Sequence, residues 1–250
     1  YCLRASRLLQ NLTQPVIIGT GFPVAGSFET DGPVGAIALY RALETLGAQP
    51  WLACAPPLAD RIGGDFRVLG LTSTNLDQAT REARATLEEL SPAVVVSIER
   101  PGLTDDGRYY NMRGVDITDQ CGVFDPFVTE CSCPSIGIGD GGNEIGMGKV
   151  RDAVTSLSIR GAVTPCDELV VADVSNWGAY ALILFLGRWA GKDLLADQAP
   201  LEVLEYLSSL GSVDGVTGEN TLTEDGMSAD EGIDLIEELR LLADGALLDD

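Results

Sequence analysis

Carboxylates and glycines crowd residues 137–148, which read Gly-Ile-Gly-Asp-Gly-Gly-Asn-Glu-Ile-Gly-Met-Gly. The first half has the glycine spacing of a dinucleotide-binding turn. Asp140 and Glu144, however, stand where a pyrophosphate would bind, at a predicted helix N-terminus that attracts anions. A cation held between protein and substrate explains these two carboxylates better. The alternative is a tight turn in which both acids only charge the start of the helix.

A second pair of carboxylates, Glu29 and Asp31, comes just before another predicted helix. Alternate residues of an extended stretch point to the same side, so both can face one ion. Four oxygen ligands without cysteine or histidine predict a hard divalent cation, Mg²⁺ or Mn²⁺, at Glu29, Asp31, Asp140 and Glu144. The alternative for Asp31 is that it caps the helix that follows it.

The chain contains no histidine, which excludes a Ser-His-Asp triad and a histidine-ligated zinc site. Its closest cysteine pair, Cys131-x-Cys133, lacks the spacing of a zinc site. Proton transfer must then use other side chains, and we assign the catalytic role to Asp140 and Glu144.

Arg100, Arg108 and Arg113 cluster in one stretch of an otherwise acidic chain. A guanidinium group matches the geometry of a carboxylate or a phosphate, so this stretch is expected to bind an anionic substrate. Ion pairing with neighbours such as Glu99 and Asp116 is the alternative.

Four further polar residues complete the predicted substrate site. Ser175 and Asn176 begin a predicted buried helix, where the backbone N–H groups can bind a substrate carboxylate or be capped by these side chains. Asn111 lies beside the arginines and Asn143 beside the glycines. We assign both to the substrate together with their loops.

Short apolar runs alternate with longer helical patterns along the chain. Buried strands are predicted at 15–19, 51–54, 94–98, 135–139 and 169–173, and helices at 34–46, 76–90, 144–157, 176–189, 201–210 and 229–243. This alternation predicts an α/β fold, in which a mostly parallel sheet has helices on both faces as in a Rossmann-like three-layer sandwich. The length of the chain, 250 residues, favours a single domain over residues 1–250.

The unusual loops of this sequence all follow predicted strands. In open α/β sheets, ligands bind outside the carboxyl ends of the strands, so we expect these loops to converge on one cleft. We expect residues 213–218, which are rich in glycine, to form a flexible lid over it.

The charge is strongly negative, with 38 acidic and 16 basic residues and a net charge of −22. Such a field repels nucleic acids and anionic membranes. We interpret it as adaptation to high salt, where screening weakens the repulsion, rather than as an acidic tail that binds a partner. Nothing in the sequence resembles a signal peptide or a membrane span, so we expect a cytoplasmic protein. A homo-oligomer is compatible with the sequence.

Several runs resemble the D-glutamate cyclase-like family, whose domain forms the C-terminal part of a mitochondrial enzyme and occurs alone in archaea and bacteria. They are Glu-Thr-Asp-Gly-Pro at 29–33, Ser-Ile-Glu-Arg-Pro at 97–101, Gly-Arg-Tyr-Tyr-Asn-Met-Arg-Gly at 107–114, the whole run at 137–148, and Val-Ser-Asn-Trp-Gly-Ala-Tyr at 174–180. Gly-Asp-Gly-Gly-Asn-Glu is the most specific part, and the resemblance covers nearly the whole chain. Residues 120–134 and 157–165 are less regular than the family pattern.

The resemblance implies conversion of D-glutamate to 5-oxo-D-proline and water. The arginines would then bind the two carboxylates of the substrate, and the metal would polarise the γ-carboxylate. Asp140 or Glu144 would take a proton from the α-ammonium group so that the nitrogen can attack. Two other classes remain open: a metal-dependent phosphohydrolase, and a non-catalytic nucleotide or amino-acid sensor.

Overall fold

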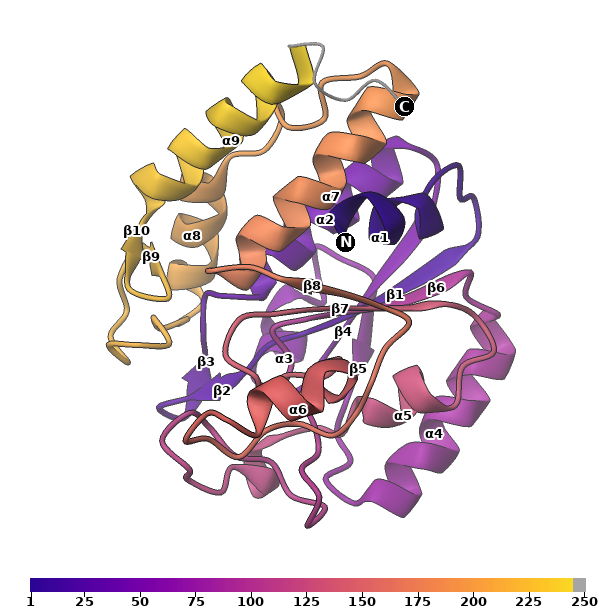
Figure 1. Cartoon of the computed structure of the whole chain (residues 1–250), viewed down its shortest axis with the longest axis vertical. Helices are drawn as coiled ribbons and strands as arrows, with labels where there is room; N and C mark the ends of the chain where they lie inside the picture. The colour runs from indigo at the N-terminus through magenta and orange to yellow at the C-terminus, as the bar shows by residue number, and fades with distance from the viewer. Residues whose placement is uncertain (245–250) are drawn as a thin grey trace.

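Six parallel strands form the central sheet of the computed structural model, which describes residues 1–244 (Figure 1). They are β1 (Pro15–Thr20), β4 (Gln49–Cys54), β5 (Val68–Gly70), β6 (Val94–Ile98), β7 (Ser135–Gly139) and β8 (Glu168–Val171). The order across the sheet is β5-β4-β1-β6-β7-β8. The chain therefore builds outward from β1 on one side and from β6 on the other. The order reverses between these two strands, which is where ligands bind in doubly wound folds.

Strand β1 lies in the interior of the sheet, which explains the unbroken apolar run Val16-Ile17-Ile18. Ile18 pairs with Leu52 of β4 and with Val96 of β6. Ile18 packs into the larger hydrophobic core, whereas Ile17 packs into a second core on the other face. Successive side chains of a strand alternate between faces, so a strand covered on both sides needs an unbroken apolar run.

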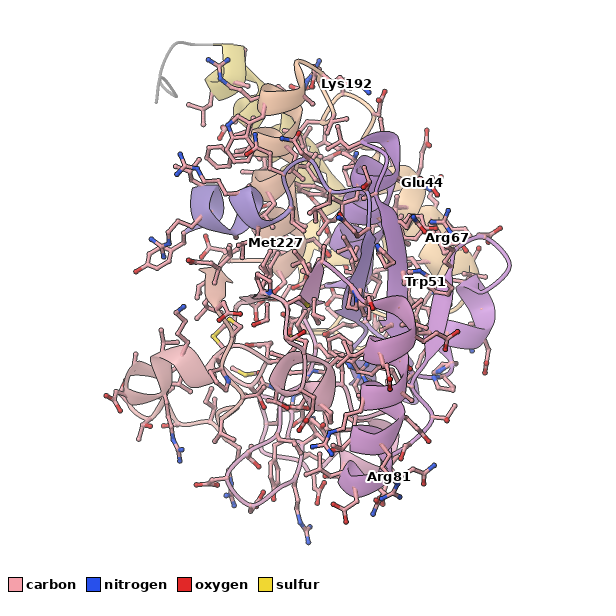
Figure 2. The ribbon with its side chains drawn as sticks, turned by 90° about the vertical axis from the view of Figure 1, so that its right-hand side faces the viewer. Glu44, Trp51, Arg67, Arg81, Lys192 and Met227 are labelled. Atoms are coloured by element: carbon pink, nitrogen blue, oxygen red, sulfur yellow. The ribbon has the colours of Figure 1, made fainter. Side chains whose placement is uncertain are left out.

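Helices cover both faces of this sheet and confirm the predicted three-layer α/β fold (Figure 1). On one face lie α1 (Cys2–Leu8), α2 (Pro33–Thr45), α7 (Ser175–Ala190), α8 (Pro200–Ser209) and α9 (Ala229–Asp244). On the other lie α4 (Leu76–Leu90) and α5 (Asp125–Thr129). In Figure 2, Lys192 after α7 and Arg81 of α4 lie at opposite ends, with Trp51 of β4 between them.

Short elements fill the connections between these layers. They are the helices α3 (Leu58–Ile62) and α6 (Arg151–Val154), the 3₁₀ turns Thr118–Gln120 and Gly148–Val150, the hairpin of β2 (Pro23–Val24) with β3 (Ser27–Phe28), and the hairpin of β9 (Thr223–Glu224) with β10 (Met227–Ser228). No helix within residues 1–244 is long and apolar enough to cross a membrane. The last six residues of the predicted domain lie outside the described part.

The predicted helices coincide with α2, α4, α7, α8 and α9 except at terminal residues, but the helix predicted at 144–157 is wrong. Glu144 forms a β-bridge with Pro101, and Gly146 and Met147 bridge to Pro165. The N–H of Gly146 donates to the carbonyl of Thr164 at 2.8 Å, so it has a partner outside any helix. Only Arg151–Val154 within this range is α-helical.

Candidate functional site

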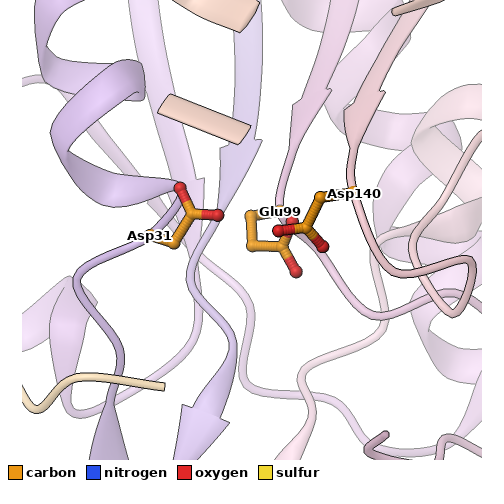
Figure 3. Close-up of side chains that lie close together, drawn as sticks. All are labelled: Asp31, Glu99 and Asp140. Carbon is orange, nitrogen blue, oxygen red and sulfur yellow. The ribbon is translucent and has the colours of Figure 1, made fainter. Parts of the chain in front are cut away.

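Three carboxylates from three loops meet at the carboxyl end of the sheet (Figure 3). Asp31 lies between β1 and α2, Glu99 follows β6, and Asp140 follows β7. One oxygen atom of each side chain lies within 4.8 Å of the others. The group sits where the strand order reverses between β1 and β6, so the fold itself brings these loops together.

Asp31 is held by the N-terminus of α7 as well as by its own neighbour. Its Oδ1 accepts the N–H groups of Gly32 and Asn176, and its Oδ2 accepts that of Ser175, each at 2.9 Å. In return, Oδ1 of Asn176 accepts the N–H groups of Gly32 and Gly35 at the start of α2, at 2.8 and 2.6 Å. The Asp31 side chain, which lies just before α2, thus accepts N–H groups at the start of α7, and the Asn176 side chain of α7 accepts N–H groups at the start of α2. Neither set of N–H groups has a partner within its own helix.

This exchange changes the role predicted for Ser175 and Asn176. Their N–H groups, expected to bind a substrate carboxylate, are occupied by the protein's own Asp31. Both side chains are fully buried, and the Ser175 hydroxyl donates to Glu99 at 2.6 Å. The two residues therefore position ligands of the site rather than face the cavity above it.

Glu99 was not among the predicted metal ligands. It is 6% exposed and has a left-handed φ of 45°, which costs a non-glycine residue about 1 kcal/mol or more. Gly32, with φ 90°, makes room for it, because a Cβ on Gly32 would lie 2.7 Å from the Cβ of Glu99. The sequence did carry a signal, since an acid directly follows a buried strand. Its proximity to Asp31, however, depends on the strand order.

The glycines at 139–142 surround a carboxylate instead of a phosphate. The side chain of Glu144 accepts the N–H groups of Gly141 and Gly142 at 3.0 and 2.8 Å. A Cβ on Gly139 or Gly141 would lie 2.9 Å from these carboxylate oxygens. The donors that would bind a pyrophosphate are thus already used, which disfavours a dinucleotide. The alternative of acids at a helix start is also wrong, because no helix begins within residues 139–147.

A cavity of about 1180 Å³ opens beside these carboxylates. Its wall carries the acidic residues Glu29, Glu99, Asp140, Glu144, Asp173 and Asp225. Arg113 is the one cationic residue on this wall within the described part of the chain. Asp225 was not predicted either, because it belongs to the short turn between β9 and β10 that the sequence did not reveal.

Residues 213–218, predicted to form a flexible lid, line the cavity and are hydrogen-bonded to Asp214. This buried carboxylate accepts the N–H groups of Val216, Thr217 and Gly226 at 3.0, 2.8 and 2.7 Å. It also accepts the hydroxyl of Thr223 at 2.7 Å. The same bonds hold the β9–β10 turn and with it the cavity-lining Asp225. The segment is therefore a wall of the cavity.

The predicted arginine cluster does not act as one unit. Arg100 is 1% exposed, and its guanidinium donates to the carbonyls of Gly21, at 2.6 Å, and Gly122. Arg108 is exposed and pairs with Asp116 at 2.7 Å. The substrate-binding assignment therefore has structural support only for Arg113.

Arg113 lies on the cavity wall and links two of its loops. Its Nη2 donates to the carbonyl of Val216 at 3.3 Å. Asn111 shapes the turn beneath it, because its Oδ1 accepts the N–H groups of Arg113 and Val115, both at 3.0 Å. Residues 111–115 and 213–218 thus form adjoining walls.

Asn143 links the loop at 137–148 to the loop that carries Tyr110. It is 2% exposed and lines the wall, and its Nδ2 donates to the carbonyl of Tyr110 at 3.0 Å. This bond fixes the orientation of the amide. Its Oδ1 is buried and has no partner among the described residues. A buried acceptor without a donor is costly.

Burial and mutual repulsion raise the pKa values of the clustered carboxylates. Burial raises the pKa of Asp31 to about 7, against the lowering effect of the N–H bonds from Asn176 and Ser175. Burial, then the charges of Asp31 and Glu144, raise the pKa of Asp140 to about 9. Burial, then the charges of Glu144 and Asp140, raise the pKa of Glu99 well above its ordinary value.

Such a cluster can ionise fully only beside a compensating positive charge. Its donors are carboxylate oxygens, which are the ligands that Mg²⁺ and Mn²⁺ prefer. Asp31, Glu99 and Asp140 therefore fit a hard divalent cation. Glu29 and Glu144 from the predicted ligand set lie on the adjoining wall and add negative charge to it.

Comparison with known proteins identifies the family of this chain. A sequence model described as D-glutamate cyclase-like, C-terminal, matches residues 1–240. The chain belongs to the D-glutamate cyclase-like family. It is 37% identical over 207 residues to the human mitochondrial D-glutamate cyclase, an alignment that covers 72% of this chain and 33% of the relative. The chain thus spans about a third of the length of that relative.

Two solved structures resemble this chain, both with low TM-scores and low sequence identity. The cobalt-bound deoxy-D-mannose-octulosonate 8-phosphate phosphatase of Haemophilus influenzae has a TM-score of 0.38 and 13% identity, covering 82% of this chain and 99% of that chain. The aldohexose dehydrogenase of Thermoplasma acidophilum has a TM-score of 0.33 and 12% identity, covering 93% and 88%. Neither likeness bears on the site.

Proposed function

We propose that this chain cyclises D-glutamate to 5-oxo-D-proline and water, with a divalent cation held by Asp31, Glu99 and Asp140. The observation that carries the proposal is the buried carboxylate group at the strand-order reversal. Membership of the D-glutamate cyclase-like family supports the reaction. When bound, the cation, Mn²⁺ or Mg²⁺, would supply Lewis-acid polarisation of the γ-carboxyl group.

Asp140 is the residue best placed to move protons. In the reaction, the α-nitrogen bonds to the carbon of the γ-carboxyl group, a carbon–oxygen bond of that group breaks, and the oxygen leaves as water with two protons from the ammonium group. Asp140 is only partly buried and lines the cavity, so its carboxyl group can reach a substrate there. It can pass a proton from nitrogen to oxygen. Glu144, held by Gly141 and Gly142, positions that loop.

Arg113 and Asn143 are the residues available to orient the substrate. Arg113 can bind the α-carboxyl group with its guanidinium fork. The buried Oδ1 of Asn143 can accept an N–H of the α-ammonium group. Holding both groups favours the bent conformer in which nitrogen approaches the carbon of the γ-carboxyl group, and ring closure gains much from such positioning.

The test is chiral chromatography of 5-oxoproline formed from D-glutamate by protein loaded with MnCl₂ or MgCl₂. We expect turnover that chelation removes. Asp140→Asn should lower kcat by about 100-fold or more, the usual contribution of a proton-transfer group. The matched control Asp197→Asn, at an exposed position, should match the parent.

Two outcomes would favour the other classes. Phosphate release from an aryl phosphate, with D-glutamate left intact, would indicate a phosphohydrolase. Saturable binding of D-glutamate without product would indicate a sensor. A rate of 5-oxoproline formation no higher than the spontaneous one in metal-loaded protein would refute the cyclase proposal.

A further inference from the structure

The cavity is more acidic than a site for a free dicarboxylate requires. Among the described residues, six acidic side chains line it and Arg113 is the one basic side chain. Arg100 and Arg108, expected to neutralise substrate carboxylates, are bonded elsewhere. With the γ-carboxylate beside the cation, the α-carboxylate of D-glutamate would have only Arg113 to pair with on a wall of carboxyl groups. A neutral group at that position would meet less repulsion.

Four large apolar side chains on the wall of the same cavity are exposed, and we call this group its mouth. Met112, Val115, Val171 and Val216 form it, and each side chain is 50–59% exposed. They are four of the twelve exposed large hydrophobic residues in the described chain, so a third of such residues gather at one opening. Apolar side chains grouped at a cavity indicate a ligand with an apolar part. Free glutamate has only its methylene groups to offer.

The position of Arg113 shows which end of the substrate would reach this mouth. Arg113 lies between Met112 and Val115 in sequence, and it donates to the carbonyl of Val216 on the facing loop. Because Arg113 receives the α-carboxyl group, a substituent on that group would extend between residues 111–115 and 213–218. The volume of about 1180 Å³ exceeds the roughly 300–1,000 Å³ of pockets for drug-sized ligands, which are larger than glutamate.

We infer that the preferred substrate is a D-glutamyl group extended through its α-carboxyl as an amide, with an apolar residue next to it. This inference rests on the proposed cyclisation and specifies its substrate class. The chemistry is unchanged: the free α-nitrogen bonds to the carbon of the γ-carboxyl group, and one oxygen of that group leaves as water with two ammonium protons. The α-amide stays intact, and its carbonyl oxygen accepts the guanidinium donors of Arg113.

Charge and apolar contact can be tested separately with four substrates: D-glutamate, its α-amide, D-glutamyl-glycinamide and D-glutamyl-leucinamide. We expect kcat/KM for the α-amide to exceed that for D-glutamate by about tenfold at low salt. That ratio should shrink between about 0.1 and 1 M KCl, because screening weakens the field. Leucinamide should exceed glycinamide by about tenfold at every salt concentration, since apolar burial is not screened by ions.

Variants at the mouth give an independent readout. The double variant Val115→Ser, Val216→Ser should reduce the ratio of kcat/KM for leucinamide over glycinamide toward one. Leu157→Ser, a control 52% exposed and away from this cavity, should leave that ratio as it is. Loss of the ratio in both variants would overturn the assignment of the mouth as the subsite.

The outcomes separate this inference from the proposed function. Turnover of D-glutamate that matches or exceeds turnover of every amide would overturn the inference and leave the cyclase proposal standing. Turnover of the amides that exceeds turnover of D-glutamate supports the inference about the substrate class. Failure to cyclise any of the four substrates would overturn both.

Discussion

Replacing Glu99 by glutamine tests whether repulsion between buried carboxylates dominates this site. Glutamine keeps the size of the side chain and an oxygen that can accept the Ser175 hydroxyl, now 2.6 Å away. The charge that it removes lies within 4.8 Å of oxygens on Asp31 and Asp140. Two unit charges at 4.8 Å repel by about 3 kcal/mol at an effective dielectric constant of about 20. We expect the metal-free variant to gain about this much unfolding free energy where the cluster is ionised.

The gain in unfolding free energy from Glu99→Gln must increase as pH rises. Burial, then the charges of Glu144 and Asp140, raise the pKa of Glu99 well above its ordinary value of 4.5. As pH rises past 4.5, the unfolded chain releases a proton that the folded protein keeps, so the stability of the parent falls. Glutamine binds no such proton. The advantage of Glu99→Gln should therefore be absent near pH 4 and grow as pH rises.

A divalent cation should reverse the comparison. The parent can give the ion three carboxylates, whereas Glu99→Gln gives it two and a neutral amide. Because a ligand that binds more tightly stabilises the folded state more, MnCl₂ should raise the stability of the parent more than that of the variant. If the substitution acted only through packing, it would change the unfolding free energy by the same amount in chelator and in MnCl₂.

Urea denaturation followed by tryptophan fluorescence measures these differences between pH 5 and 9, in chelator or in MnCl₂. The control Glu89→Gln removes the same charge from an exposed position on α4 and should change stability little. The reasoning is refuted if Glu99→Gln is no more stable than the parent in chelator at pH 8. It is also refuted if MnCl₂ stabilises both proteins equally.

Two further predictions concern the fold. Arg100→Lys should destabilise the protein by about 2–4 kcal/mol, measured by urea denaturation, because lysine cannot donate to the carbonyls of both Gly21 and Gly122. Arg108→Lys, at an exposed ion pair, should cost less than about 1 kcal/mol. If the charge of −22 is a salt adaptation, the melting temperature should rise with KCl into the molar range. A flat or falling curve would contradict that interpretation.

The layers of this fold could be predicted because their signals are local. The apolar runs Val94–Ile98 and Ser135–Gly139 and the amphipathic Leu76–Leu90 match β6, β7 and α4 residue for residue. Since parallel strands end at one edge, the loops that carry Asp31 and Asp140 could also be placed together. The structure does bring them together.

The rest depends on contacts that no local pattern encodes. Asp31 bonds to Ser175, which is 144 residues away in the sequence, so its helix partner could not be read from its own neighbours. Glu99 joins the cluster only because β6 lies beside β1 in the sheet. Arg100 looked like a substrate ligand, but its side chain turns inward to backbone carbonyls. A type of side chain predicts a chemistry, whereas its direction is set by packing.

Asp31 and Asp140 differ in a way that supports separate roles for them. Asp31 is 2% exposed and yet its pKa rises only to about 7, whereas partly buried Asp140 rises to about 9. Bonds from the N–H groups of Gly32, Ser175 and Asn176 stabilise the charged form of Asp31 against the cost of burial. Asp31 therefore ionises first and is the natural anchor for a cation. Among the hydrogen bonds of the described residues Asp140 has no comparable set of backbone donors, so in the metal-free protein it keeps its proton to a higher pH than Asp31 does.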